Sequence, residues 1–134
     1  MAANTSPIFA LVPETKIVTV TTATTDRTGA TTTNLVELLT ATTDGTKITQ
    51  IGAKAAGSNV ATSVLIFITN TSGTSPKLYD EIAMAAITAG TTTTSQRAVT
   101  AYSDLQLKSG QKVLVGITVA VTDGINIFAI KGDY

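Results

Sequence analysis

The sequence predicts an all-β fold, an antiparallel β-sandwich of jelly-roll-like arrangement with an extended N-terminal arm. Short apolar runs of strand length follow one another along the chain, and none shows a convincing helical period. Turn residues separate these runs at short intervals, which is typical of a sandwich or a jelly roll. Threonine, which favours strands, fills about a fifth of the chain.

The first residues predict an extended arm over 1–16, followed by a single domain over 17–134. A length of 134 residues fits one domain with its own core, and no linker or repeat divides it. Pro7 and Pro13 interrupt regular strand pairing within the arm. The arm also carries four apolar side chains that are unsuited to water, namely Ile8, Phe9, Leu11 and Val12. We therefore expect it to pack on its own domain or on a neighbouring subunit.

Three strands are predicted in the first half of the domain, at residues 16–23, 34–41 and 47–55. The polar segment 24–33 between the first two is predicted to be a loop. The second segment is also compatible with a turn of helix, but Asp44-Gly45 follows it, and this dipeptide is a strong hairpin signal. We therefore predict that the second and third strands form a hairpin about Asp44-Gly45.

Five further strands are predicted, at residues 63–70, 77–84, 95–102, 112–121 and 125–132. The run SVLIFITN is apolar on both faces, which places it centrally in its sheet. The stretch DEIAMAAITA is compatible with a helix, and strand is preferred because the segment before Ala85 alternates. Asp123-Gly124 is predicted to form a tight terminal hairpin with Gly124 at positive φ, so that Ile125 to Ile130 pair back along 113–121.

The composition excludes several kinds of site and partner. The chain has no Cys and no His, which removes disulfides, thiolate metal sites and the commonest general base. Nine basic residues balance nine acidic ones without a basic run, so no nucleic acid partner is expected. There is no run of about 18 apolar residues, so no membrane span is expected. The first residues also lack the features of a secretion signal.

The remaining polar residues do not form a catalytic pattern. No His activates a serine, and G-x-S-x-G does not occur. Asp80 and Glu81 are adjacent, so on a strand they point to opposite faces. Asp26, Asp44 and Asp123 lie in apparent turns, where Asp caps its own backbone, although a weak Ca²⁺ site built from loop carboxylates is an alternative. We predict no catalytic residue, cofactor or metal ligand, and we expect that the chain is not an enzyme.

The low charge of the chain raises the question of its sheet edges. Charged residues make up 13% of the chain, about half the usual share, and natural monomers commonly use charges to guard edge strands. One interpretation is that neighbouring subunits cover the edges, which a net charge near zero also favours. The other is a monomer with short or twisted edges.

Several short motifs follow one another along the chain. Asp44-Gly45-Thr46 leads into a strand, an apolar run from Val64 to Ile68 follows, and Leu78 to Ile82 comes after a polar loop. The segment LQLKSGQKVLVGI, the closing AIKGDY and the early SPIF complete the series. In this order the motifs resemble those of small β-sandwich virion proteins of tailed bacteriophages and prophages, the head decoration or auxiliary capsid proteins.

The resemblance implies a structural protein that decorates or cements the capsid through protein–protein contacts. It implies capsid or other virion proteins as partners, a homo-oligomer with a trimer favoured, and a place in the virion after assembly in the bacterial host cytoplasm. It brings no catalytic residue and no cofactor.

Two other classes of function compete with this expectation. A head-fibre or tail adhesin module would bind host-surface glycans with the loops 24–33, 71–76 and 90–95, and an aromatic cluster in the loops would favour it. A small enzyme comes last, and a pocket holding Asp80 or Glu81 beside a lysine would favour it.

Overall fold

The computed structural model of the chain describes residues 12–134, which form eight β-strands. The strands are β1 (Val12–Val20), β2 (Val36–Thr40), β3 (Thr46–Ala55), β4 (Thr62–Ile68), β5 (Lys77–Met84), β6 (Arg97–Leu107), β7 (Lys112–Ile117) and β8 (Ile125–Asp133). Within these residues there is no helix, so no helix is present that could cross a membrane. Each of the eight predicted strands overlaps one observed strand.

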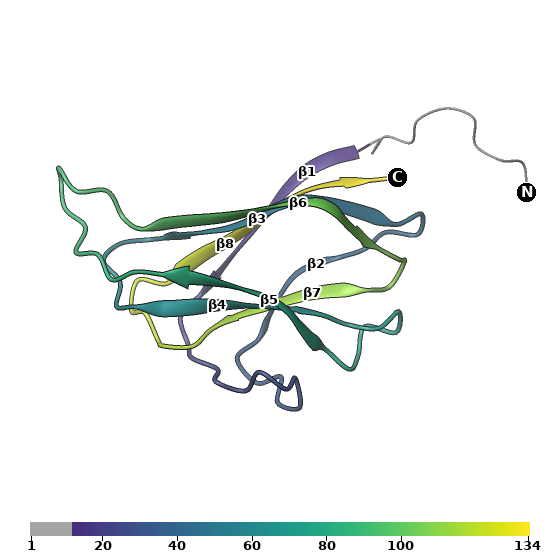
Figure 1. The fold of residues 1–134 in the computed structure, drawn as a ribbon, viewed down its shortest axis with the longest axis horizontal. Coiled ribbons are helices and arrows are strands. Elements are labelled where there is room, and N and C mark those ends of the chain that lie inside the picture. The colour runs from purple at the N-terminus through teal and green to yellow at the C-terminus, as the bar shows by residue number, and fades with distance from the viewer. Residues whose placement is uncertain (1–11) are drawn as a thin grey trace, which may run out of the picture.

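The strands form two four-stranded antiparallel sheets that lie one above the other (Figure 1). The first sheet has the order β1-β8-β3-β6, and the second has the order β2-β7-β4-β5. Most connections therefore pass from one sheet to the other, and only β4 and β5 are both consecutive and paired. This strand order is that of a jelly roll, which confirms the predicted fold class.

The core lies between the two sheets and is almost entirely aliphatic. Strand residues alternate between inward and outward positions, so each sheet contributes every second side chain. Ile51 and Ile127 of the first sheet and Val64, Ile66 and Val115 of the second are fully buried. The fold thus rests on branched aliphatic side chains that suit both strands and dense packing.

Strand β4 is central in the second sheet, as its doubly apolar sequence predicts. Its outward residues Leu65 and Phe67 are 0% exposed, although they point away from the core. Segment 21–35, which connects β1 to β2, covers this outer face. The Thr24 amide donates to the Ile117 carbonyl at 2.8 Å, and the Arg27 side chain reaches Glu81 on β5 at 2.8 Å. The predicted polar loop 24–33 is therefore a cover that closes the outside of the second sheet.

Both Asp-Gly pairs turn the chain, but neither forms the predicted hairpin. Gly45 and Gly124 have φ values of 95° and 85°, in the region that favours glycine. However, β2 pairs with β7, while β8 pairs with β1 and β3. In both places the chain crosses to the opposite sheet. A tight turn reverses the chain equally well along one sheet or between two, and the local sequence does not distinguish these cases.

Some strand limits also differ from the prediction. Strand β1 begins at Val12, so residues 12–16 belong to the first sheet and not to an arm. Pro13 fits there because β1 is an edge strand, where a missing N–H is tolerated. Strand β7 ends at Ile117, four residues before the predicted end, and β6 continues to Leu107.

Each of the four edge strands carries a feature that hinders pairing with another sheet. Strand β1 has Pro13 and two charged residues, and β2 is short and irregular in register. A bulge interrupts β5, and another interrupts β6 beside Tyr102. Bulges, charges and prolines are known guards of sheet edges. Features other than charge therefore guard these edges, and the low charge alone does not call for neighbours there.

We predict that Gly124→Val lowers the free energy of unfolding by about 1–2 kcal/mol, because a side chain at positive φ is strained. An added Cβ would also lie 2.7 Å from Thr19 Cγ2 and 3.1 Å from Thr21 Cγ2. Because β8 lies between β1 and β3, the whole domain should melt earlier, without separate fraying of the last strand. Thermal melting beside wild type measures this, and an unchanged midpoint would contradict it.

Candidate functional site

The outer face of the first sheet is uncharged at its centre, and no described segment covers it. Its centre consists of two rows of outward side chains, one from each strand. The registers place Ile17, Phe128, Gly52 and Val99 in one row, and Thr15, Ile130, Gln50 and Ala101 in the next. None of these eight residues is charged, and we call them the open face. Ile17 is 62% exposed and Ile130 is 39% exposed.

Phe128 makes the centre of the open face flat. An added Cβ at Gly52 would lie 2.5 Å from Phe128 Cζ and 2.9 Å from Val99 Cγ2, so the ring leans across the glycine. The Arg97 guanidinium lies 5.9 Å from the centre of the same ring, within cation–π range. Glycine is needed at position 52 because its neighbours occupy the space of a side chain.

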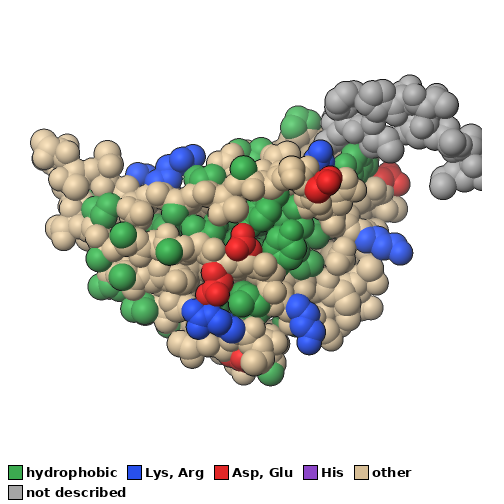
Figure 2. Space-filling view, in the orientation of Figure 1, with side chains coloured by type: hydrophobic (Ala, Val, Ile, Leu, Met, Phe, Trp, Pro, Cys, Tyr) green, Lys and Arg blue, Asp and Glu red, His purple; other side chains and the backbone are tan. Residues whose placement is uncertain are grey.

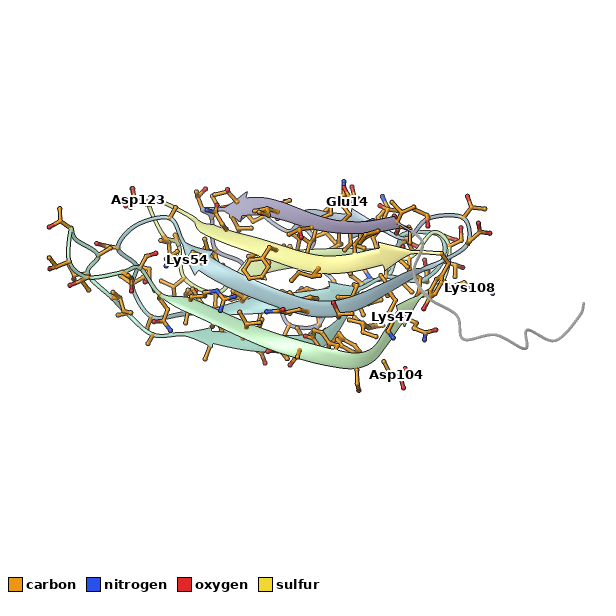
Figure 3. The ribbon with its side chains drawn as sticks, turned by 90° about the horizontal axis from the view of Figure 1, so that it is seen from above. Glu14, Lys47, Lys54, Asp104, Lys108 and Asp123 are labelled. Atoms are coloured by element: carbon orange, nitrogen blue, oxygen red, sulfur yellow. The ribbon has the colours of Figure 1, made fainter. Side chains whose placement is uncertain are left out.

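The two outer faces of the sandwich thus differ in cover. The outward Leu65 and Phe67 of the second sheet are 0% exposed, and Thr24 and Leu35 lie against Gly116 beside Leu65. Ile17 and Ile130 of the first sheet face the solvent. Figure 3 views the first sheet from above, with Lys54 and Asp123 toward one end and Lys47, Asp104 and Lys108 toward the other. A neutral apolar area between charged ends is typical of a surface that contacts protein.

A buried charge cluster lies at the end of the sandwich where β1 and β8 meet. The Lys131 side chain is 3% exposed, and its Nζ donates to both Asp133 oxygens at 2.9 and 3.0 Å and lies 3.2 Å from Glu14 Oε2. The Thr46 hydroxyl donates to Asp133 at 2.7 Å, and Lys16 pairs with Glu14 at 3.3 Å. The four charged residues of the cluster line an open groove of about 550 Å³ between β1 and β2, together with the buried Leu38 and Leu39.

The cluster holds its members in the charged state. Burial alone would raise the pKa of Asp133, but hydrogen bonds from the Lys131 ammonium and the Thr46 hydroxyl outweigh it and lower that pKa. Burial would lower the pKa of Lys131, and the bonds to Asp133 and Glu14 reverse the direction and raise it. The ion pair between Lys131 and Glu14 holds β8 and β1 together.

The four turn residues singled out in the sequence, Asp44, Gly45, Asp123 and Gly124, serve as turns and are not brought together. Asp26 caps its own loop, accepting from the Thr28 and Thr31 amides at 2.8 Å each, and the Thr28 hydrogen bonds lower its pKa. Among residues 12–134 no three acidic side chains gather as metal ligands would. The Ca²⁺ alternative therefore finds no support in this part of the chain.

Of the predicted arm residues, Ile8, Phe9 and Leu11 lie outside the described residues. Val12 is the first residue of β1, opposite Asp133, and it is 55% exposed. The predicted burial of Val12 against another chain therefore stays a prediction.

The adjacent acids of β5 each engage a different partner. The Tyr102 hydroxyl donates to Asp80 Oδ2 at 2.7 Å, which joins β6 to β5, and Glu81 pairs with Arg27. Burial and this bond to Asp80 raise the pKa of Tyr102 well above its ordinary value. The rings of Tyr79 and Tyr102 lie 5.9 Å apart, but both belong to strands and not to loops.

The loops proposed for glycan binding lie at different places. An added Cβ at Gly29 would lie 2.1 Å from the Pro76 carbonyl oxygen, so loops 24–33 and 71–76 touch. Loop 90–95 lies at the opposite end of the sandwich, where Lys54 Nζ donates to the carbonyl oxygen of Ser95. Figure 2 shows charged side chains scattered over one side of the molecule, without a continuous basic area.

Sequence reasoning missed both the open face and the buried charge cluster. The signal for the open face was available, because INIFAIKG in β8 is apolar on both faces, as SVLIFITN in β4 is. The signal for the cluster was the placement of Lys131 and Asp133 at inward positions of that strand, in phase with Ile125, Ile127 and Ala129.

Comparisons with known proteins add little to this description. No family model matches the chain, and no curated protein matches its sequence. Among solved structures it is similar to Eiger TNF from S. frugiperda, with 13% identity over 94% of this chain and 96% of that chain, and a TM-score of 0.48. A likeness at this level carries no inference about function.

Proposed function

We propose that this chain is a structural, non-catalytic virion protein of a tailed phage that decorates or cements the capsid through protein–protein contacts. The observation that carries the proposal is the open face, an uncharged area that no described segment covers. The order of sequence motifs that resembles phage head proteins supports the choice of the virion. Capsid proteins and copies of the chain are the proposed partners.

The open face suits contact better than chemistry. Burying an exposed aliphatic side chain such as Ile17 or Ile130 stabilises a contact by roughly 1.5–3 kcal/mol at most, before ordering costs. The sandwich behind the face is rigid, because its core residues are fully buried and β8 is paired on both sides. Such a face keeps its shape on binding, which lowers the entropic cost of assembly.

The arm is the proposed link to the capsid or to an adjacent subunit. It precedes β1 at the edge of the first sheet, and its apolar residues Ile8, Phe9 and Leu11 suit a protein groove better than water. Since β1 begins at Val12, residues 1–11 can be removed without shortening any described strand.

Deletion of residues 1–11 is expected to leave a folded β domain that no longer binds capsids. The physical reason is the loss of apolar side chains whose burial drives docking. The measurement is co-sedimentation of the wild-type and deleted proteins with capsids from the phage that encodes the chain, followed by cryo-EM reconstruction. Unchanged capsid binding by the deleted protein would remove the arm from the proposal. Absence of the wild-type chain from the reconstructed particle would overturn the virion function itself.

The number of copies of the chain at each position in the particle is a separate part of the proposal. The resemblance favours a trimer, and the same reconstruction counts the copies at each position. The glycan-binding alternative is disfavoured, because its loops lie at two ends of the domain and its closest tyrosine pair lies on strands.

A further inference from the structure

We propose that the groove between β1 and β2 receives the apolar run 8–11 from the N-terminal arm of a second copy of this chain. The inference rests on the proposed function in taking the arm as a link between proteins, and it selects an adjacent subunit as what the arm holds. It follows from the opening on this side of the sandwich, from the charges along the groove, and from the place where the arm joins β1.

The sandwich is open on the side where β1 and β2 form its edges. On the opposite side, the Tyr102 hydroxyl of β6 donates to Asp80 of β5 at 2.7 Å, which bridges the two sheets. Among residues 12–134, no side-chain hydrogen bond or ion pair joins β1 to β2 in the same way. The groove of about 550 Å³ lies in this gap, and its volume falls within the range of roughly 300–1,000 Å³ that is common for binding pockets.

The charges at the groove are already paired, so an occupant needs no charge of its own. The charged side chains along and beside it form ion pairs of 2.9 to 3.6 Å with one another, namely Glu14, Lys16, Glu37, Lys112, Lys131 and Asp133. Three of them are acidic and three are basic, so they leave no net charge. Leu38 and Leu39 also line the groove, and Ile17 on the β1 wall is 62% exposed. An apolar, uncharged segment suits this lining, because a buried charge without a partner is costly.

The arm has the composition and the length that this groove requires. Residues 2–11 read AANTSPIFAL and contain no charged side chain, and the run 8–11 is entirely apolar. In extended form these four residues span about 13 Å, and the wall of the groove from Glu14 to Val18 is about 17 Å long. The apolar run therefore fits along the groove between the edges of the two sheets.

The place where the arm joins β1 selects a second copy as the source of the run. Val12 and Pro13 are already paired with β8, so entry into the groove of the same copy needs a chain reversal just before Val12. The run IFAL at 8–11 contains none of the residues that favour tight turns, namely Gly, Pro, Asn, Asp and Ser. Val12 lies opposite Asp133, which lines the groove, so the arm leaves each copy beside one end of its own groove. Two copies that meet at this side can therefore exchange arms.

Disulfide trapping tests the occupant of the groove, because the chain has no native cysteine. The variants Ala10→Cys/Thr40→Cys and Ala10→Cys/Thr42→Cys each place one thiol in the arm and one at the groove. Mild oxidation should link position 10 to at least one of the two groove positions, and non-reducing gels should show that the link joins different copies. The control Ala10→Cys/Thr91→Cys carries its second thiol on an exposed loop at the other end of the sandwich and should link at least tenfold less. Mass spectrometry of tryptic peptides identifies the linked positions.

Sedimentation equilibrium of the full chain measures the association that the exchanged arms produce. The apparent mass should rise above the 13.7 kDa of one copy as the concentration increases. The variant Ile8→Asp/Phe9→Asp should associate at least tenfold more weakly, because its two added charges would enter a groove that has no free partner for them. The matched control Asn4→Asp/Thr5→Asp adds the same charge to the arm outside the apolar run and should associate as wild type does. Circular dichroism should show the same β content in all three proteins.

Five results would each overturn the inference. They are a link from arm to groove within one copy, no link at either groove position, equal linkage in the Thr91 control, a constant mass of 13.7 kDa at all concentrations, and wild-type association by Ile8→Asp/Phe9→Asp. None of these bears on whether the chain occurs in virions. Conversely, a chain that exchanges arms as described but is absent from particles would retain the arm exchange and lose the proposed function.

Discussion

Replacing Lys131 by methionine is expected to lower the free energy of unfolding by about 3 kcal/mol, because removal of one partner of a buried ion pair leaves the other charge unpaired. Asp133 is 8% exposed and would keep only the Thr46 hydroxyl of its present hydrogen-bond partners. Methionine fills a similar volume, so the loss comes from charge and not from a cavity. Urea denaturation at pH 7 measures the change.

Two further variants separate the buried cluster from general effects of charge. Lys108→Met changes an exposed lysine and should leave stability within about 0.5 kcal/mol of wild type. Lys131→Met combined with Asp133→Leu should recover much of the loss, since apolar residues often replace a buried ion pair at little cost. A single Lys131→Met variant as stable as Lys108→Met would show that the ion pairs contribute nothing.

The cluster also makes stability depend on pH at both extremes. The pKa of Asp133 lies below the ordinary value of about 3.9, so its contribution is complete above that pH and is lost as pH falls through the lower folded value. The pKa of Lys131 lies above the ordinary value of about 10.4, so its contribution is complete below that pH and is lost as pH rises through the higher folded value. The difference between wild type and Lys131→Met should therefore be largest near neutrality and shrink in acid.

Substitution of Gly110 by alanine is expected to lower the melting temperature by about 8 °C or more. Gly110 has a φ of 88°, and an added Cβ would lie 2.0 Å from the carbonyl oxygen of Thr71. Positive φ alone costs about 1–2 kcal/mol. The clash costs more, because backbone of the β4–β5 loop must move away from the β6–β7 turn.

Gly90→Ala is the matched control for this variant. Gly90 has no atom within 4 Å of an added Cβ and has no positive φ, so its melting temperature should match that of wild type. Equal melting of the Gly110 and Gly90 variants would mean that the β6–β7 turn does not press against the Thr71 backbone.

The amino-acid sequence by itself determined which residues form strands and where the chain turns. SVLIFITN predicts a central strand, because both of its faces are apolar, and β4 is central. Asp-Gly pairs allow positive φ at glycine, and Gly45 and Gly124 both adopt it. The absence of His and Cys also limited the chemistry available to any site. These features depend on the alternation of apolar and polar side chains, on turn geometry and on side-chain type. Each of these can be read within a few neighbouring residues.

The tertiary structure decided which strands became neighbours. Asp123-Gly124 carries the same local signal whether the chain returns along β7 or crosses to lie between β1 and β3. The second outcome buries Ile125, Ile127 and Ala129 against the opposite sheet, and this gain depends on residues distant in sequence. The same crossing brings Lys131 to Glu14, more than a hundred positions away in the chain.

The tertiary structure also decided which outer sheet face is buried. Strands β4 and β8 are both apolar on two faces, yet Phe67 is fully buried and Ile130 remains exposed. The composition of a strand states that its outer face should be buried, but not by what. That depends on where a loop from elsewhere in the chain, or a second molecule, comes to lie, because burial is a property of packed surfaces and not of a local sequence.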